Sequence, residues 1–207
     1  MLNYLQMLFY QWNDHYYDNL LCSYVYVNTM IGLPVEVLPY VRGVQLVLVG
    51  YSGYTKGSRI KVDKMVRNEI VRAVGRIRNH MQIILENQYR EGNLDLAQKA
   101  KICMEECDHL IEDVNKSVSG MQHAFLSGQK SPTRGELKRL IKHDHDVIDM
   151  VTKAVNLANS AEQSIALQEG KEQQLVLHTT QLVTSCRGFF GARANILAGL
   201  SQKKKRK

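Results

Sequence analysis

After residue 58, apolar residues recur at steps of three or four, the spacing that lines one face of an α-helix. The pattern predicts long helices at 58–90, 93–125, 132–169 and 171–200. Gly92, Gly170 and the Gly/Pro-containing loop 127–135 separate them, and Asn93 is a suitable N-cap. Four amphipathic helices joined by short turns bury their apolar stripes only against one another. The expected fold is all-α, an antiparallel four-helix bundle of long helices.

The composition changes sharply near residue 55. Nine of the ten tyrosines and the single Trp precede it, and Arg42 is the only basic residue there. That part has three carboxylates and a net charge of −2. Because the whole chain has a net charge of +7, the rest carries +9. We expect an aromatic helix or irregular segment to about Met30, then short extended pieces over 34–49. The predicted organisation is an aromatic N-terminal segment of uncertain order (1–54), the bundle (55–200) and a basic tail (201–207).

The stretch "GYSGYTKGS", residues 50–58, has the outline of a phosphate-binding loop. That loop requires G-x-x-x-x-G-K-[ST], so that backbone amides wrap the phosphates and the hydroxyl holds Mg²⁺. Counted from Gly50, Lys56 is in place, but Thr55 and Gly57 occupy the positions of the second glycine and the hydroxyl. We therefore expect no nucleotide site, and no cofactor.

Two further clusters suggest metal binding but favour a simpler interpretation. In "KHDHD", residues 142–146, the two histidines are two apart and point to different faces of a helix, so a solvated charged patch is expected. Cys103 and Cys107 have helical spacing, but they fall on an apolar stripe where cysteine packs as a small hydrophobe. With no catalytic grouping apparent, the sequence predicts a protein that is not an enzyme.

Basic residues form the candidate binding site, for polyanions or a filament. On the first long helix they are Arg67, Arg72, Arg76 and Arg78, and at the end of the chain they are Lys203, Lys204, Lys205, Arg206 and Lys207. The net charge favours acidic partners such as nucleic acid, anionic lipid or an acidic filament. The closing run is equally typical of a nuclear import signal, a membrane arm or a solvated end.

The compartment expected from the sequence is a reducing one. Four scattered cysteines fit free thiols better than a disulfide framework. The first residues carry no basic region of the kind that opens a secretory signal, and no apolar run has membrane length. A cytoplasmic, cytoskeleton-associated protein is predicted, with a nuclear location as the alternative.

Two stretches of the last helices, "VNLANSAEQS" (155–164) and "TTQLVTSCRGFFGARANILAG" (179–199), resemble the vinculin and α-catenin family of helical-bundle adaptors. The matching positions are Asn156, Leu157, Ala158, Gln181, Leu182, Cys186, Ala192, Arg193, Ile196 and Leu197. The resemblance covers about forty-five residues. It implies a cytoskeletal or junctional adaptor whose bundles bind actin filaments or the short helices of partner proteins, without catalytic residues.

Two hypotheses for the function follow. The first is a non-enzymatic interaction module, cytoskeletal or in cell adhesion, that binds actin filaments or a partner's amphipathic helix, with opening at the glycine-bearing fourth helix. The alternative is a nuclear or nucleic-acid-associated basic helical protein that uses its lysine-rich tail. Self-association as a homodimer stays open.

Overall fold

A computed structural model describes residues 35–117, 124–129 and 131–201, and within them the protein is all-helical, without strands. A 3₁₀ turn (η1, Val35–Val37) leads into a short helix, α2 (Leu38–Gln45). Four long helices follow: α3 (Arg59–Arg90), α4 (Leu94–Lys116), α5 (Arg134–Ala166) and α6 (Glu172–Ser201). The predicted all-α class is confirmed.

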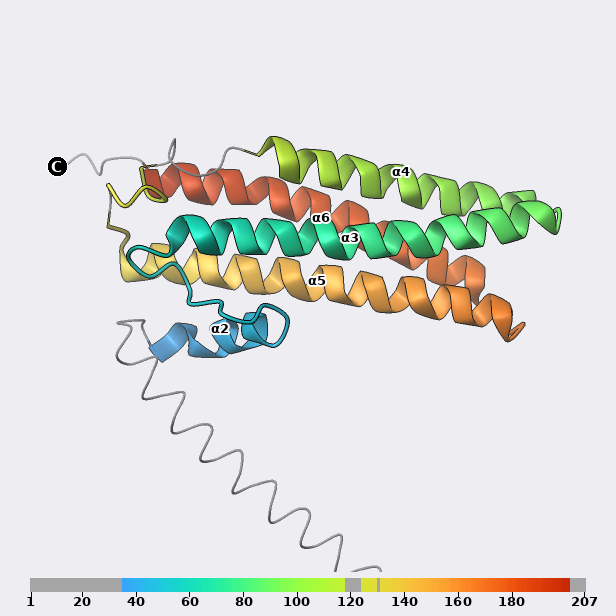
Figure 1. Ribbon diagram of the computed structural model, residues 1–207, viewed down its shortest axis with the longest axis horizontal. Helices are drawn as coiled ribbons and strands as arrows, with labels where there is room; N and C mark the ends of the chain where they lie inside the picture. Colours follow the sequence, from blue (N-terminus) through green and yellow to red (C-terminus); the bar gives the residue numbers. More distant parts are fainter. Residues whose placement is uncertain (1–34, 118–123, 130, 202–207) are drawn as a thin grey trace, which may run out of the picture.

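The long helices lie side by side as a bundle (Figure 1). Helix α3 packs against α4 and α5, and α6 packs against the same two helices, so each long helix has two long neighbours. The stripe predicted for the first long helix is buried throughout: Val62, Val66, Ile70, Val74, Ile77, Met81 and Ile84. Burial of apolar surface between the helices is the main stabilising contribution.

The ends of the helices have identifiable causes. Asn93 caps α4 as predicted, because its side-chain oxygen accepts from the amide of Leu96 at 3.4 Å. Thr133 and Glu136 form a capping box at the start of α5, in which each side chain bonds the backbone amide of the other. These local signals are readable from the sequence.

Helix α4 ends earlier than predicted, at Lys116 instead of about residue 125. Ser117 is extended, and its hydroxyl donates to the carbonyl of Val114 at 2.7 Å. From α3, Arg67 donates to the carbonyl of Ser117 at 2.9 Å, which satisfies an acceptor that the helix would otherwise use. Phe125 is buried in a turn after the helix, while residues 118–123 of the predicted helix lie outside the described residues.

The extended pieces predicted over 34–49 were wrong where the structure describes them. Residues 38–45 are helical, and residues 46–50 form turns. Pro39 lies in the first helical turn, where its missing amide costs nothing. Val37, Val41 and Val44 are spaced by three or four and bury one face of α2, which packs against α5. This valine-rich segment is helical because only helical spacing brings its buried valines onto one face.

The face predicted for α6 is buried only in part; the residues expected on it are Leu175, Leu182, Cys186, Phe189, Ile196 and Leu197. Leu175, Leu182 and Ile196 pack only at the edge of the core, and Phe189 is 36% exposed. Cys186 and Leu197 of that face are buried as expected, together with Val176, Thr179, Val183, Phe190 and Arg193. Apolar residues occur in adjacent pairs along this helix, so the sequence offers two faces about 100° apart. Because this face is buried, the side chain of Arg193 lies inside the bundle.

Candidate functional site

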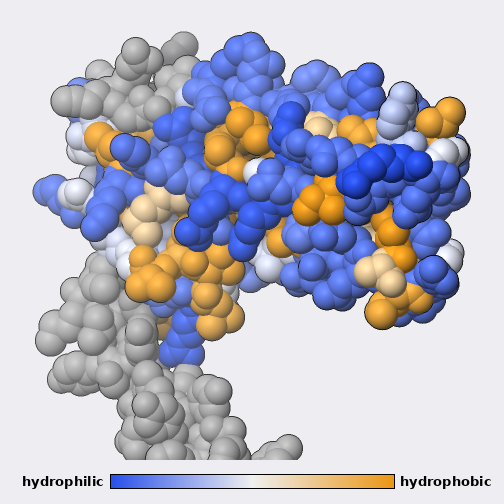
Figure 2. Space-filling view, turned by 45° about the vertical axis from the view of Figure 1, so that its right-hand side comes forward, coloured by the Kyte–Doolittle hydropathy of each residue, from blue (hydrophilic) through white to orange (hydrophobic). Residues whose placement is uncertain are grey.

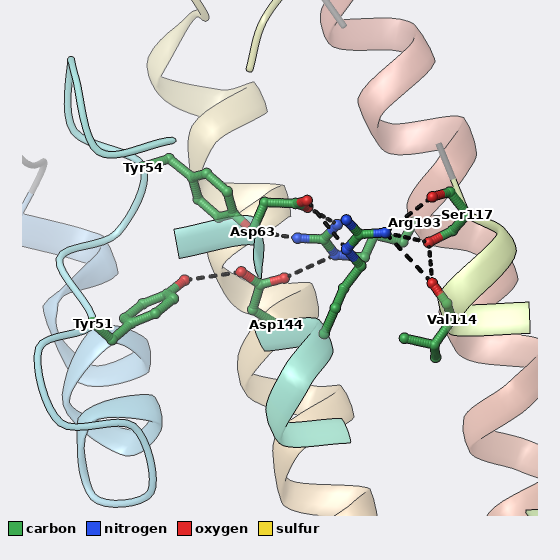
Figure 3. A network of polar contacts seen from close by, with 8 residues as sticks. Tyr51, Tyr54, Asp63, Val114, Ser117, Asp144 and Arg193 are labelled. Atoms are coloured by element: carbon green, nitrogen blue, oxygen red, sulfur yellow. Dashed lines mark hydrogen bonds and ion pairs between the residues drawn. The ribbon is translucent and has the colours of Figure 1, made fainter. Parts of the chain in front are cut away.

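A buried polar network crosses the bundle where the start of α3 meets the last third of α6 (Figure 3). Arg193 of α6 is 3% exposed and lies between two carboxylates. It donates to Asp63 Oδ1 of α3 at 2.5 Å and, through Nε, to Asp144 Oδ1 of α5 at 3.2 Å. Both carboxylates are buried. The guanidinium thus joins three long helices through charge-assisted hydrogen bonds.

Two tyrosines from the loop between α2 and α3 complete this network on its other side (Figure 3). Tyr51 donates its hydroxyl proton to Asp144 Oδ2 at 3.0 Å, and Arg193 Nη2 donates to the hydroxyl oxygen of Tyr54. Both rings are buried and meet edge-on, with centroids 6.5 Å apart. Burial, reinforced by the charge of Asp144, raises the pKa of each phenol well above its usual value. The tyrosines therefore stay neutral.

Arg67 extends the network to the end of α4. Its Nε lies 3.3 Å from Asp63 Oδ2, while Nη1 reaches the carbonyl and the hydroxyl of Ser117 at 2.9 and 3.0 Å. Two arginines therefore face two aspartates, so the formal charges balance. Burying charges costs several kcal/mol per ion unless they are paired in this way. We call Tyr51, Tyr54, Asp63, Arg67, Asp144 and Arg193 the Arg193 network.

Electrostatics keep Arg193 charged. Burial acts to lower its pKa, but the charges of the carboxylates of Asp144 and Asp63 more than offset this, and the pKa is raised. An arginine that remains protonated donates hydrogen bonds but takes no proton, so it supplies no acid–base chemistry. The network is suited to joining α3, α5, α6 and the loop before α3.

A groove of about 280 Å³ lies between the end of α4 and the last part of α6, beside Arg193. Phe190, Ala194 and Leu197 supply its apolar wall. Arg187 and Asp113 lie at its border, with Arg187 Nε 2.6 Å from Asp113 Oδ2. We call this the α4/α6 groove. Its apolar wall and paired charges suit a protein side chain better than a charged small molecule.

The structure does not bring the predicted basic residues together as one open patch in the part it describes. Arg67 is drawn into the Arg193 network, with 15% of its side chain exposed. Arg72 and Arg76 are 68% and 53% exposed, although both contact Glu69. Arg78 donates to Asp108 at 2.7 Å. Lys203, Lys204, Lys205, Arg206 and Lys207 lie outside the described residues.

The solvated patch expected at residues 142–146 is wrong for two of its members. His143 and Asp144 are buried, whereas His145 and Asp146 are partly exposed. His143 Nε2 hydrogen-bonds the carbonyl oxygen of Phe189 at 2.9 Å, and the two rings stack at 4.7 Å. Among the described residues, no three His, Cys, Asp or Glu side chains gather as a metal ion needs.

The core packing predicted for Cys103 and Cys107 is confirmed, since both are fully buried on α4. Sequence reasoning missed the Arg193 network itself. One feature of the sequence indicates that Arg193 is buried. It follows Cys186 by seven residues, about two helical turns, and so lies on the same face of the helix. That signal is usable only once the buried face of α6 is known.

Fold and site together define the class of this protein, an all-helical bundle with a buried, charge-balanced network. Comparisons with protein-family models, with curated proteins and with solved structures give no significant match. None of the described helices is both long and apolar enough to cross a bilayer. The relation to the vinculin and α-catenin family remains a proposal.

Proposed function

We propose that this chain is a non-enzymatic helical-bundle interaction module, a cytoskeletal or cell-adhesion adaptor of the vinculin and α-catenin type. Its four long helices act as an antiparallel bundle that binds actin filaments or the amphipathic helices of partner proteins. The α4/α6 groove carries the proposal, because Ala194 is exposed in it beside the buried side chains of Phe190 and Leu197. Grooves of this kind take the apolar face of a helix.

The rest of the surface agrees with a binding role. Figure 2 shows a largely hydrophilic face with small hydrophobic patches between the charged side chains. Exposed Arg72 and Arg76, with the lysine-rich tail 203–207, supply attraction to an acidic surface such as a filament. The proposed location is cytoplasmic, at the cytoskeleton.

Helix α6 is the element that yields when a partner binds. Gly188 and Gly191 lie on its exposed side near the groove, and each lowers helix stability by about 1 kcal/mol relative to alanine. The Arg193 network holds the same part of α6 to α3 and α5. Opening is therefore local and limited by that network.

The test is co-sedimentation of the full chain with actin filaments at physiological salt. A chain ending at Gln202 and the variants Ala194→Glu and Asn195→Glu are measured alongside. Ala194 lines the groove, whereas Asn195 is exposed next to it and does not. We expect saturable binding that survives loss of the tail, is weakened at least tenfold by Ala194→Glu and is unchanged by Asn195→Glu.

A nucleic-acid function is the competing outcome, favoured by the exposed arginines of α3 and the basic tail. A duplex DNA binding curve across a salt series distinguishes it. For binding to phosphates alone, the logarithm of the binding constant falls linearly with the logarithm of the salt concentration, and binding disappears with the tail. DNA binding of that kind, without filament binding, would replace the adaptor proposal with a nuclear, polyanion-binding function.

A further inference from the structure

The short helix α2 occupies a surface of α5 on the outside of the long helices (Figure 1). Val37, Val41 and Val44 are each fully buried there. At one end of the contact, Lys138 Nζ of α5 donates to Glu36 Oε2 at 2.8 Å. An amphipathic helix with apolar anchors and an acidic residue before its first turn therefore fits this face.

One position of this contact discriminates by size. A Cβ atom added to Gly43 would lie 2.6 Å from His145 Nε2, so a larger residue at Gly43 clashes with the imidazole ring. On the preceding turn, Tyr40 meets the edge of the same imidazole at a centroid distance of 5.5 Å. The face thus selects a small residue three positions after an aromatic one.

Helix α2 is intrinsically weak. Its eight residues are fewer than an isolated helix needs, no side chain caps its start, and Gly43 lies inside it. Besides its own buried valines, the loop that follows holds it in place, through Tyr51 on Asp144 and Tyr54 on Arg193. Tyr54 adopts φ +35, a backbone conformation unfavourable for a bulky residue. The loop is therefore fixed by its tyrosine contacts and not by backbone preference.

We propose that the face of α5 beneath α2 is a docking site for an amphipathic helix of a partner protein, with α2 as an intramolecular occupant. The tyrosine contacts of the following loop set how readily α2 leaves. The partner helix carries an acidic residue before its first turn, apolar residues in register with Val37, Val41 and Val44, and a small residue over His145. This site is separate from the α4/α6 groove and goes beyond the proposed adaptor function.

The probe is a fluorescently labelled peptide of residues 35–49 added to the full chain. In wild type, the tethered α2 competes at an effective concentration of about millimolar, so the peptide binds weakly. In Tyr51→Phe the hydrogen bond to Asp144 is lost, and α2 leaves more readily. We expect about tenfold tighter peptide binding, which corresponds to about 1.4 kcal/mol.

A peptide with Gly43→Val is the matched control. It is more apolar, yet we expect at least tenfold weaker binding to Tyr51→Phe, because of the clash with His145. The double variant Tyr51→Phe/His145→Ala removes that ring and restores binding of this peptide. Non-specific hydrophobic binding would favour the valine peptide in every chain, and that outcome overturns the proposal.

Three other results also overturn the proposal. One is the absence of peptide binding to Tyr51→Phe at millimolar peptide, with circular dichroism showing that the variant is folded. The second is equal affinity for wild type and Tyr51→Phe. The third is dimerisation of Tyr51→Phe in sedimentation equilibrium, which would assign the face to α2 of a second copy. None of these measurements uses filaments, so they fail or succeed independently of the adaptor function.

Discussion

Arg193 is the residue on which the interior of this bundle depends. Its guanidinium faces Asp63, Asp144 and Tyr54, which come from three separate parts of the chain. Such a buried network contributes to stability only while it is complete, because a missing partner leaves an uncompensated charge in a region of low dielectric. At this scale, stability is controlled by charge balance as much as by apolar contact.

Replacing Arg193 with methionine tests this balance. Arg193→Met leaves both carboxylates buried with one cation fewer, and we expect the free energy of unfolding to fall by about 3–5 kcal/mol. Urea denaturation measures the loss. Arg187→Met is the control on the same helix, because its ion pairs with Asp113 and Glu106 are half-exposed and screened by solvent, so a much smaller loss is expected. Equal losses in the two variants would contradict the role given to Arg193.

His143 makes stability depend on pH. Burial lowers the pKa of this imidazole below its usual value of 6.5, and its Nδ1 has no hydrogen-bond partner among the described residues. Protonation is thus easier in the unfolded chain. Its contribution is fully present above pH 6.5 and is lost as the pH falls through that value, until the folded form also takes up the proton.

We therefore expect the free energy of unfolding to fall between pH 8 and pH 5.5, and less steeply in His143→Gln than in wild type. Glutamine keeps a donor for the carbonyl of Phe189 but does not titrate. Urea denaturation at both pH values gives the two slopes. Identical slopes would show that His143 does not couple protonation to folding.

At the scale of the elements, α6 is the helix whose residues least favour it. Gly188 and Gly191 fall within it, and a Cβ atom added at either position meets no atom of the described residues within 4 Å. Its buried stripe also includes Thr179, whose hydroxyl donates a hydrogen bond to the carbonyl of Leu175 at 2.8 Å. Packing against α4 and α5 therefore stabilises α6 more than its own propensity does.

Gly188→Ala should stabilise the protein by about 0.5–1 kcal/mol, because alanine loses less backbone entropy and finds open space. Thermal and urea denaturation both report this. Gly170→Ala is the opposite control: this glycine has φ +74 in the turn before α6, where a side chain is strained, so stability should fall by about 1–2 kcal/mol. Lower stability of Gly188→Ala would contradict this expectation, because it would mean that the added methyl group meets a neighbour absent from the described packing.

At the scale of the whole molecule, residues 37–54 act as part of the core. Val37, Val41, Val44, Leu48, Tyr51 and Tyr54 all belong to one buried cluster with the long helices. This segment and the bundle therefore share a hydrophobic interior, although their compositions differ. The loop before α3 closes over the Arg193 network, while α2 packs beside α5.

A chain that begins at Thr55 tests this sharing. It leaves Asp144 and Arg193 without their tyrosines and uncovers apolar surface, so we expect a loss of roughly 3 kcal/mol. For a domain of this size, that lowers Tm by about 6–12 °C. The control is the full chain with Leu46→Ser and Val49→Ser, which are 89% and 91% exposed and should leave Tm nearly unchanged. An unchanged Tm for the shortened chain would make the segment an independent appendage.

The parts of the fold that sequence predicts are those with a single local solution. Helix α3 has one apolar stripe opposite a charged face, and its buried residues follow the helical spacing that the sequence shows. The start of α4 and the end of α3 follow from Asn93 and Gly92. The end of α4 was not predictable, because Arg67 reaches it from another helix, forty-seven to fifty positions away.

The amino-acid sequence by itself determined the all-helical class, the positions of the long helices and the burial of Cys103 and Cys107, because helical spacing and caps are local properties. Only the tertiary structure decided which face of α6 is buried, that residues 38–45 form a helix, and that Asp63, Asp144 and Arg193 meet. The physical reason is common to all three. Each depends on the free energy of burying a group against a distant part of the chain, which no local pattern contains.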